Sequence, residues 1–411
     1  MKFLHTSDWH LGKLFHEKSM IEDQKFMLEK IFDIMKKEAD KGEGYDALVV
    51  SGDIYDRAMP PSEAVSLLNG FLVKVTAQLP NLHIFMNAGN HDSAARLSYA
   101  AEFLEQHNIH FSTNTKKICE PVILEDEKNG KAAFYQLPFL TPLSIEMSAE
   151  NPDAAEGDES HPLRTQQELY KEACSQILSN HKKNYGNLPC VLNAHLFAMG
   201  SSTASSERTN VGTAEQVDGS LFEDFTYGAF GHIHKYQACD KEKHCFYPGS
   251  LLAYNFDDNP ENGILEVEIK SVESSKPNLS VKRIVLEPLH PIVKIKAKMS
   301  ELIGSAANKN LINENKDKYV QAILTDEVMP TEAFSTLKTV FPNLLSVISQ
   351  EQSRANKSSS IQERKEAILS NDPEKIFIQF MKDANPDFEN DDLFQKQKAL
   401  FVQEATGGAE D

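Results

Sequence analysis

The sequence predicts a layered α/β domain followed by a smaller second α/β domain. Short apolar segments of strand length alternate with longer segments of helical periodicity, and polar residues of metal-binding type follow several of the strands directly. In such sheets ligands bind beyond the carboxyl ends of the strands, so these polar residues are expected to meet at one edge. The length of 411 residues suggests two or three domains.

The first elements follow from apolar runs and helix-start signals. A strand is expected at residues 3–6, a helix from Glu22 to Ala39, and a buried strand at residues 47–50. A second helix should begin with Ser62 as its N-cap. Its apolar face should contain Val65, Leu68, Leu72 and Val75.

The rest of the chain divides by composition. The same signals predict the remaining elements of the first domain: strands at 82–86, 190–193 and 227–230, helices at 93–107 and 163–183, and a β-rich region ending near Leu286. The predicted domains are 1–287, a small α/β domain at 288–351, a charged linker at 352–371 and a helical tail at 372–411. The tail has two apolar stripes, which either dock on a partner or pack against this chain.

Bulk properties limit the class of protein. The net charge of −19 argues against a protein that coats nucleic acid by itself, although two divalent ions in a cleft would reverse the field there. No apolar run is long enough to span a membrane, and Asp8 comes too early for a signal peptide. The five cysteines show no paired spacing, so we expect reduced thiols in a cytoplasmic protein.

Metal-binding residue types are concentrated in five stretches. They are Asp8-Trp9-His10, Gly52-Asp53, Gly89-Asn90-His91-Asp92, His195 and Gly231-His232-Ile233-His234. Mixed nitrogen and oxygen donors without thiolate suit Mn²⁺, Fe²⁺ or Zn²⁺ better than Mg²⁺. Two such ions roughly 3.5–4 Å apart can activate water and stabilise the transition state of phosphate-ester cleavage.

Roles within the set follow from residue chemistry. Asp53 has two carboxylate oxygens and can bridge two ions. His91 follows the ligand Asn90 and is expected to protonate the leaving oxygen or to hydrogen-bond the phosphoryl group. Asp92 is expected to orient His91 or a nearby backbone amide. A single histidine such as His195 is more often structural, so the specific signal is the ordered set at successive strand ends.

This ordered set resembles the calcineurin-like metallophosphoesterase superfamily, which implies a β-sandwich flanked by helices. The resemblance implies that Asp53 bridges the ions, with His91 catalytic. The implied ligands are Asp8, His10, Asp53 and His234 for one ion, and Asp53, Asn90, His195 and His232 for the other.

Longer matches resemble the nuclease members of the superfamily that work with an SMC-like ATPase. They are residues 1–12, 51–56, 60–62, 89–93 and 247–250. The resemblance implies an Mn²⁺-dependent double-strand exonuclease and single-strand endonuclease acting on DNA ends and hairpins in repair, recombination and replication. It also implies a homodimer within a heterotetramer, a DNA-contacting cap after Pro291 and a tail that docks on the ATPase. Some relatives have a second active-site histidine where this chain has Asp56, so the resemblance makes Asp56 a candidate catalytic residue together with His91 and Asp92.

Two rival functions remain open on the sequence alone. One is a phosphatase or small-substrate phosphodiesterase of the same fold, which has no need of a cap, linker and tail. The other is a non-catalytic scaffold, which the intact ligand set and His91 argue against.

Overall fold

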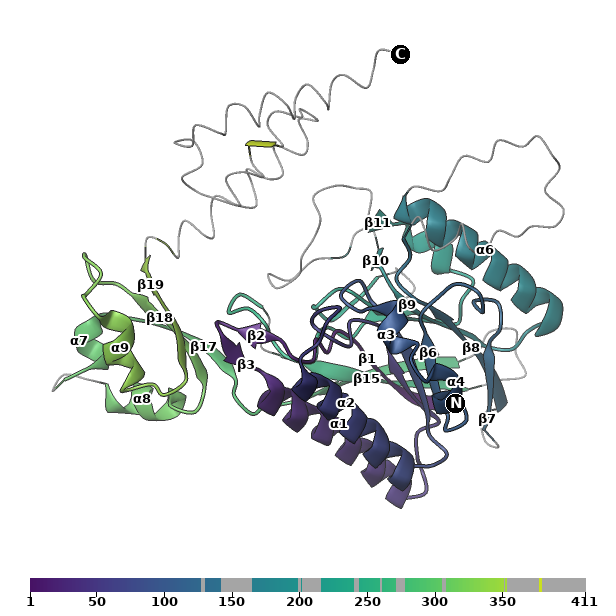
Figure 1. Cartoon of the computed structure of the whole chain (residues 1–411), viewed down its shortest axis with the longest axis horizontal. Coiled ribbons are helices and arrows are strands. Elements are labelled where there is room, and N and C mark those ends of the chain that lie inside the picture. The colour runs from purple at the N-terminus through teal and green to yellow at the C-terminus, as the bar shows by residue number, and fades with distance from the viewer. Residues whose placement is uncertain are drawn as a thin grey trace, which may run out of the picture. The chain divides into compact units, whose positions relative to one another are not determined.

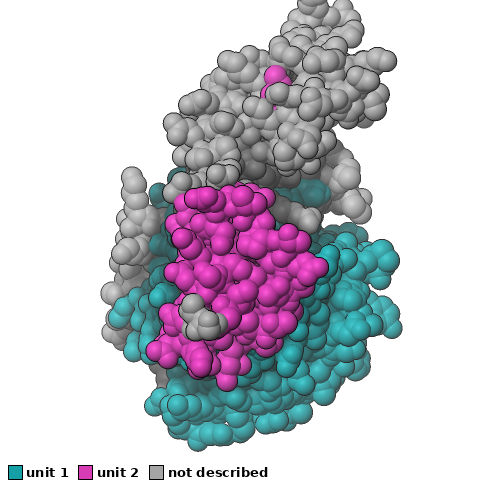
Figure 2. Space-filling model, turned by 90° about the vertical axis from the view of Figure 1, so that its left-hand side faces the viewer, with its two compact units in different colours: residues 1–209, 213–292 teal, residues 210–212, 293–411 magenta. Residues whose placement is uncertain are grey.

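A computed structural model describes most of the first domain and of the small domain. The described residues are 1–126, 130–141, 165–198, 201, 216–239, 244–258, 261–270, 278–304, 308–350, 352 and 377–378. They form two compact units, coloured separately in Figure 2, with the boundary between Ile292 and Val293. Apart from residues 352, 377 and 378, the predicted linker and tail lie outside the described residues.

The first unit contains two mixed six-stranded sheets. The first has the order β16-β15-β1-β4-β5-β6, and its strands are β1 (Lys2–Thr6), β4 (Ala47–Val50), β5 (His83–Asn87), β6 (Ile109–Ser112), β15 (Gly263–Lys270) and β16 (Asn278–Val285). The second has the order β13-β14-β12-β9-β8-β7, and its strands are β7 (Val122–Asp126), β8 (Gly130–Leu137), β9 (Cys190–His195), β12 (Tyr227–Gly231), β13 (Gln237–Ala238) and β14 (Cys245–Tyr247). In both sheets four neighbouring strands are parallel, and antiparallel pairs lie toward the edges.

The two sheets pack face to face through an apolar core. Phe3 of β1 contacts Phe134 of β8 and Tyr227 of β12 edge-on, with ring centroids 5.4 and 5.6 Å apart. Phe85 of β5 stacks on Phe134 at 4.9 Å. This arrangement confirms the predicted β-sandwich, because alternate residues of each strand face the opposite sheet.

Helices flank the sandwich. They are α1 (Ile21–Asp40), α2 (Ser62–Gln78), α3 (Ala94–Leu97), α4 (Ala101–Glu105), α6 (Gln166–Asn184) and the 3-10 helix η2 (Gly219–Phe222). Short strand pairs are β2 (Leu14–Phe15) with β3 (Lys18–Ser19) and β10 (Phe197–Ala198) with β11 (Gln216–Val217). Helices α1 and α2 lie side by side, and α6 packs Tyr170 and Ile177 against the outer face of the second sheet (Figure 1).

Three details of the predicted helices were wrong. Pro61, with extended ψ, is the N-cap of α2, while Ser62 is already helical and its hydroxyl bonds Glu63. Val65 is 45% exposed, whereas Ala64 and Phe71 are buried on that helix. The predicted helix at 93–107 is split into α3 and α4, because Ala100 adopts a left-handed conformation with φ of 60°.

The second unit is a three-stranded sheet with short helices. Its strands, in the order β17-β18-β19, are β17 (Ile292–Ala297), β18 (Tyr319–Leu324) and β19 (Leu344–Ser349). Its helices are α7 (Met299–Leu302), α8 (Lys309–Asn315) and α9 (Ala333–Lys338). The core includes Leu302, Leu337 and Phe341, each fully buried.

Candidate metal centre

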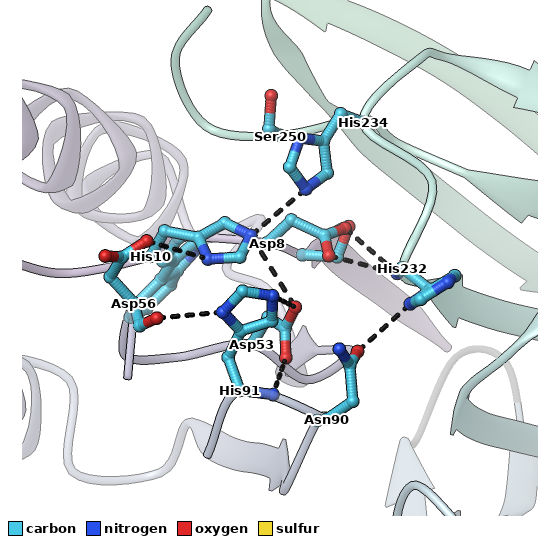
Figure 3. A network of polar contacts seen from close by, with 12 residues as sticks. Asp8, His10, Asp53, Asp56, Asn90, His91, His232, His234 and Ser250 are labelled. Carbon is cyan, nitrogen blue, oxygen red and sulfur yellow. Dashed lines mark hydrogen bonds and ion pairs between the residues drawn. The ribbon is translucent and has the colours of Figure 1, made fainter. Parts of the chain in front are cut away.

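The parallel strands bring the predicted site residues to one edge of the sandwich. Thr6 of β1 aligns with Val50 of β4, and Val50 aligns with Met86 of β5. The loops that follow these three strands therefore begin at the same edge of the sheet. In the second sheet His195 ends β9 opposite Gly231 of β12. Figure 3 shows the side chains converging from these strand ends.

The backbone at the site is held in conformations that L-residues rarely adopt. The positive φ angles are 52° at Asp8, 46° at His10, 48° at Asp53 and 100° at His232. Each such residue costs roughly 1–3 kcal/mol and persists only where its surroundings fix it. Four predicted ligands thus have strained backbone conformations, which the surrounding fold stabilises and which orient their side chains toward the site.

Asp53 lies between two groups of donor atoms. Its Oδ1 is 3.6 Å from Nε2 of His195, and its Oδ2 is 3.6 Å from Nε2 of His10. The side chain is 3% exposed. One carboxylate thus presents a different oxygen to each group, which is the arrangement that a bridging ligand requires.

The first group consists of Asp8, His10 and His234, with Asp53 Oδ2 beside it. The Nε2 atoms of His10 and His234 are 3.0 Å apart, and the ligand atoms of the three residues lie within 4.8 Å of one another. Both Asp8 oxygens accept the His232 backbone N–H, which ties this group to the next.

The second group consists of Asn90, His195 and His232, with Asp53 Oδ1 beside it. Asn90 Oδ1 lies 2.9 Å from His195 Nε2 and 3.0 Å from His232 Nδ1. His195 Nδ1 donates to the Ser51 carbonyl at 2.8 Å, so a neutral ring carries its lone pair on Nε2. That lone pair and the Asn90 oxygen face each other as two acceptors, a contact that a cation stabilises.

Burial keeps the imidazoles neutral and ready to bind cations. It lowers the pKa of His195 and of His232 to about 3, and it lowers those of His10 and His234 well below the usual value. Burial raises the pKa of the Asp53 carboxyl to about 6 in the protein alone. Bound divalent cations would reverse that effect and favour the carboxylate.

The donor set fits two divalent ions. It contains carboxylate, amide oxygen and imidazole donors without thiolate, the mixture typical of Mn²⁺, Fe²⁺ or Zn²⁺ sites. His10 Nδ1 is buried and makes no hydrogen bond with the described residues, while Asp56 Oδ1 is 3.7 Å away. The backbone of Gly89 packs closely against Asp53, since a Cβ at position 89 would lie 2.1 Å from Asp53 Oδ1.

His91 stands beside the donor groups with a fixed orientation. Its Nδ1 is 2.8 Å from the backbone carbonyl of Asp56, to which it donates, and its backbone N–H donates to Asp53 Oδ1. Its Nε2 therefore faces the site, 4.0 Å from Asp53 Oδ2. The Asp56 carboxylate is bonded instead to Lys13 Nζ at 2.7 Å.

Asp92 holds two of the loops together. Its carboxylate accepts the backbone N–H groups of Ile54, Tyr55 and Gly89 at 2.9–3.0 Å. Burial, followed by the Asp53 charge, raises its pKa to about 7 in the protein alone. Asp92 thus acts on backbone amides, which is one of its two predicted roles.

Several supporting residues were not predicted from the sequence. Gln24 is fully buried, donates to the carbonyls of Trp9 and His10 and accepts Gly12 N–H. A polar residue on the apolar face of α1 was the available signal for it. Phe139, whose ring stacks near His232, gave no such signal.

Comparisons with known proteins agree with this geometry. Residues 1–236 match the calcineurin-like phosphoesterase family, and the chain belongs to that family. Residues 288–385 match the family described as type 5 capsule protein repressor C-terminal domain. The chain is also 29% identical to the SbcD subunit of the nuclease SbcCD from Staphylococcus epidermidis over 349 residues, which cover 84% of this chain and 85% of that protein.

Family membership makes the protein a metal-dependent phosphoesterase. Among the described residues, no helix is long and apolar enough to cross a membrane.

Proposed function

We propose that this chain is the nuclease subunit of an SbcCD-type complex and cleaves DNA phosphodiesters with two Mn²⁺ ions. The observation that carries the chemistry is Asp53, whose two oxygens face two separate donor groups. The similarity to a nuclease subunit along 84% of the chain supports DNA as the substrate. The activities would be double-strand exonuclease and single-strand or hairpin endonuclease.

The protein's residues have distinct parts in this mechanism. Asp8, His10, Asp53 and His234 would hold one ion, and Asp53, Asn90, His195 and His232 the other. When bound, the ions supply Lewis-acid stabilisation of the phosphoryl oxygens and activation of water.

His91 is proposed as the general acid. Because its Nδ1–H is bonded to the Asp56 carbonyl, the protonated ring would present Nε2–H toward the leaving oxygen or the phosphoryl group. The loops stay in place because Asp92 binds amides on both.

The remaining parts of the chain suit a DNA-processing complex in the cytoplasm. Residues 288–351 are proposed as the DNA-contacting cap, and the tail at 372–411 as the docking element for an SbcC-like SMC ATPase. Residues 288–385 match one C-terminal domain family, and this supports treating the part of the chain after the first domain as a separate module. We further propose a homodimer within a heterotetramer, with α2 as one surface, since Val65 and Val73 are 45% and 59% exposed there.

The test is cleavage of end-labelled hairpin duplex DNA in Mn²⁺, with and without the ATPase partner. The His91→Ala variant should retain bound Mn²⁺ and lose cleavage by roughly 10²–10⁴-fold, the usual contribution of a general acid. The Lys2→Met variant is the matched control, because it breaks a half-buried pair with Glu38 at the start of β1, the opposite end of that strand from the site.

Each alternative gives a different result. Hydrolysis of a p-nitrophenyl ester without DNA cleavage would indicate a small-substrate phosphodiesterase. Failure to bind two ions, with no hydrolysis of either substrate, would indicate a non-catalytic scaffold.

A further inference from the structure

Two of the five cysteines lie opposite each other on a hairpin next to the metal centre. Strand β13 pairs antiparallel with β14, and Ala238 aligns with Phe246. Continuing that register by one residue makes Cys239 the direct partner of Cys245, and the Cys239 backbone N–H donates to the Cys245 carbonyl at 2.9 Å. The spacing of the two cysteines in the sequence gave no sign of this pairing, which the strand register creates.

The register places both thiols on the same face of the hairpin. Directly opposed residues of an antiparallel pair point to one side of the sheet, and in a hydrogen-bonded pair their Cα atoms lie about 5.5 Å apart. Disulfide-bonded cysteines have Cα atoms roughly 4.4–6.8 Å apart. The packing agrees, because Cys239 and Cys245 both contact the apolar cluster on the outer face of the second sheet. A disulfide between them therefore needs no rearrangement of the backbone.

The five thiols differ in their access to an oxidant. All are free; Cys239 and Cys119 are partly exposed, whereas Cys174, Cys190 and Cys245 are buried. Burial raises the pKa of Cys174 to about 12 and also raises those of Cys190 and Cys119. Thiols of this kind stay protonated, and the thiolate is the form that reacts. Cys239 thus combines access to solvent with a second thiol directly opposite.

The hairpin is continuous with the metal-binding residue His234. The His234 carbonyl accepts the backbone N–H of Ser250 at 3.1 Å, which closes the hairpin at the end next to the site. Figure 3 shows Ser250 and His234 together beside the donor groups. A Cβ on Gly249 would lie 2.8 Å from the same carbonyl, so the backbone is closely packed there. A cross-link between the cysteines would close the hairpin at its other end as well.

We propose that Cys239 and Cys245 are a modification site, a dithiol that peroxide converts reversibly to a disulfide and that thereby locks the hairpin carrying His234. The Cys239 thiolate attacks one oxygen of hydrogen peroxide, which gives a sulfenic acid and, with the thiol proton, one water. The Cys245 thiol then displaces the sulfenic oxygen as a second water and forms the S–S bond. Two thiols are oxidised and one peroxide is reduced.

The modification is reversible by thiol–disulfide exchange. Two molecules of a low-molecular-weight thiol restore both cysteines and leave as their own disulfide. The proposal does not depend on the nuclease assignment, because it concerns the thiols and the hairpin and not the substrate.

The test is peptide mapping of the full-length, Mn²⁺-loaded protein after treatment with hydrogen peroxide. Free thiols are alkylated in denaturant, and trypsin then cuts after Lys241 and Lys243, which separates the two cysteines into different peptides. The expected result is one linked pair of peptides that contain Cys239 and Cys245, with the other three cysteines still alkylated. Dithiothreitol should restore five free thiols. The Cys239→Ser variant should show no linked pair, whereas the control Cys119→Ser should show it as the wild type does.

Hydrogen exchange measures whether the disulfide locks the hairpin. Exchange of the hairpin amides at 235–239 and 245–250 should slow at least about tenfold in the oxidised wild type, because local opening of the hairpin becomes rarer. Peroxide-treated Cys239→Ser should show no such change.

Other results overturn the proposal. Five free thiols after peroxide, a sulfinic acid at Cys239 without a cross-link, or a disulfide between two chains would each reject the intramolecular pair. A linked pair with unchanged amide exchange would reject the locking of the hairpin at His234.

Discussion

Replacing Asp92 with asparagine tests how the loops around the metal centre are held. The carboxylate accepts three backbone N–H groups: Oδ2 accepts those of Ile54 and Gly89, and Oδ1 accepts that of Tyr55. An asparagine can place its single carbonyl oxygen at the Oδ2 position and keep two of these bonds. Its NH₂ group then faces the Tyr55 N–H, so that bond is lost.

The magnitude follows from these contacts. A buried donor left without a partner costs about 1–3 kcal/mol, and each of the two surviving bonds weakens by about 1 kcal/mol when its acceptor loses charge. The free energy of unfolding of the Mn²⁺-loaded protein should therefore fall by roughly 3–5 kcal/mol. In the metal-free protein the fall should be smaller, because removing the Asp92 charge relieves repulsion with Asp53.

Urea unfolding of Asp92→Asn and wild type, with saturating Mn²⁺ and with chelator, measures both values. Mn²⁺ affinity should also fall, by about 10- to 100-fold, since Asp92 supports the loops of Asp53 and Asn90. A change below about 1 kcal/mol with unchanged Mn²⁺ affinity would refute the view that Asp92 organises the site.

Three further predictions concern the site and the core. Gly89→Ala places a Cβ 2.1 Å from Asp53 Oδ1 and should weaken Mn²⁺ binding, measured by calorimetry, at least about tenfold. The control is Gly70→Ala, whose added Cβ has no atom within 4 Å and should leave Mn²⁺ binding unchanged. Burial lowers the pKa of His5 to about 3, so between pH 6.5 and 3 protons bind the unfolded chain preferentially and stability falls with falling pH. His5→Gln should therefore reduce the slope of unfolding free energy against pH by about 1.4 kcal/mol per unit in chelator, and an unchanged slope would contradict it. Chelation should lower the melting temperature, because each bound ion at a free concentration 100 times its Kd adds about 2.7 kcal/mol to the free energy of unfolding. An equal melting temperature with and without Mn²⁺ would argue against a metal centre in the folded state.

Much of the site could be predicted because its signals are local in sequence. Asp8, Asp53 and Asn90 each come two or three residues after a strand, and parallel strands in register bring those positions to one edge. The β-sandwich was predicted from resemblance and is confirmed by the structure. The roles of the individual ligands and of His91 stay predictions.

What could not be predicted depends on contacts between distant segments. The ion pair of Lys13 with Asp56 joins loops 43 residues apart, and neither position shows a pattern that pairs them. Ala100 breaks the predicted helix at 93–107 without a glycine or proline to mark the break. There the chain adopts a left-handed turn that costs about 1–3 kcal/mol and that only the surrounding structure can stabilise.

The central claim is that Asp53 joins two ions in one centre, and electron paramagnetic resonance of the Mn²⁺-loaded protein tests it most directly. We predict two Mn²⁺ per chain with an exchange-coupled spectrum in the wild type, and loss of that coupling in Asp53→Asn. A wild-type spectrum of isolated Mn²⁺, or coupling that persists in Asp53→Asn, would contradict the claim.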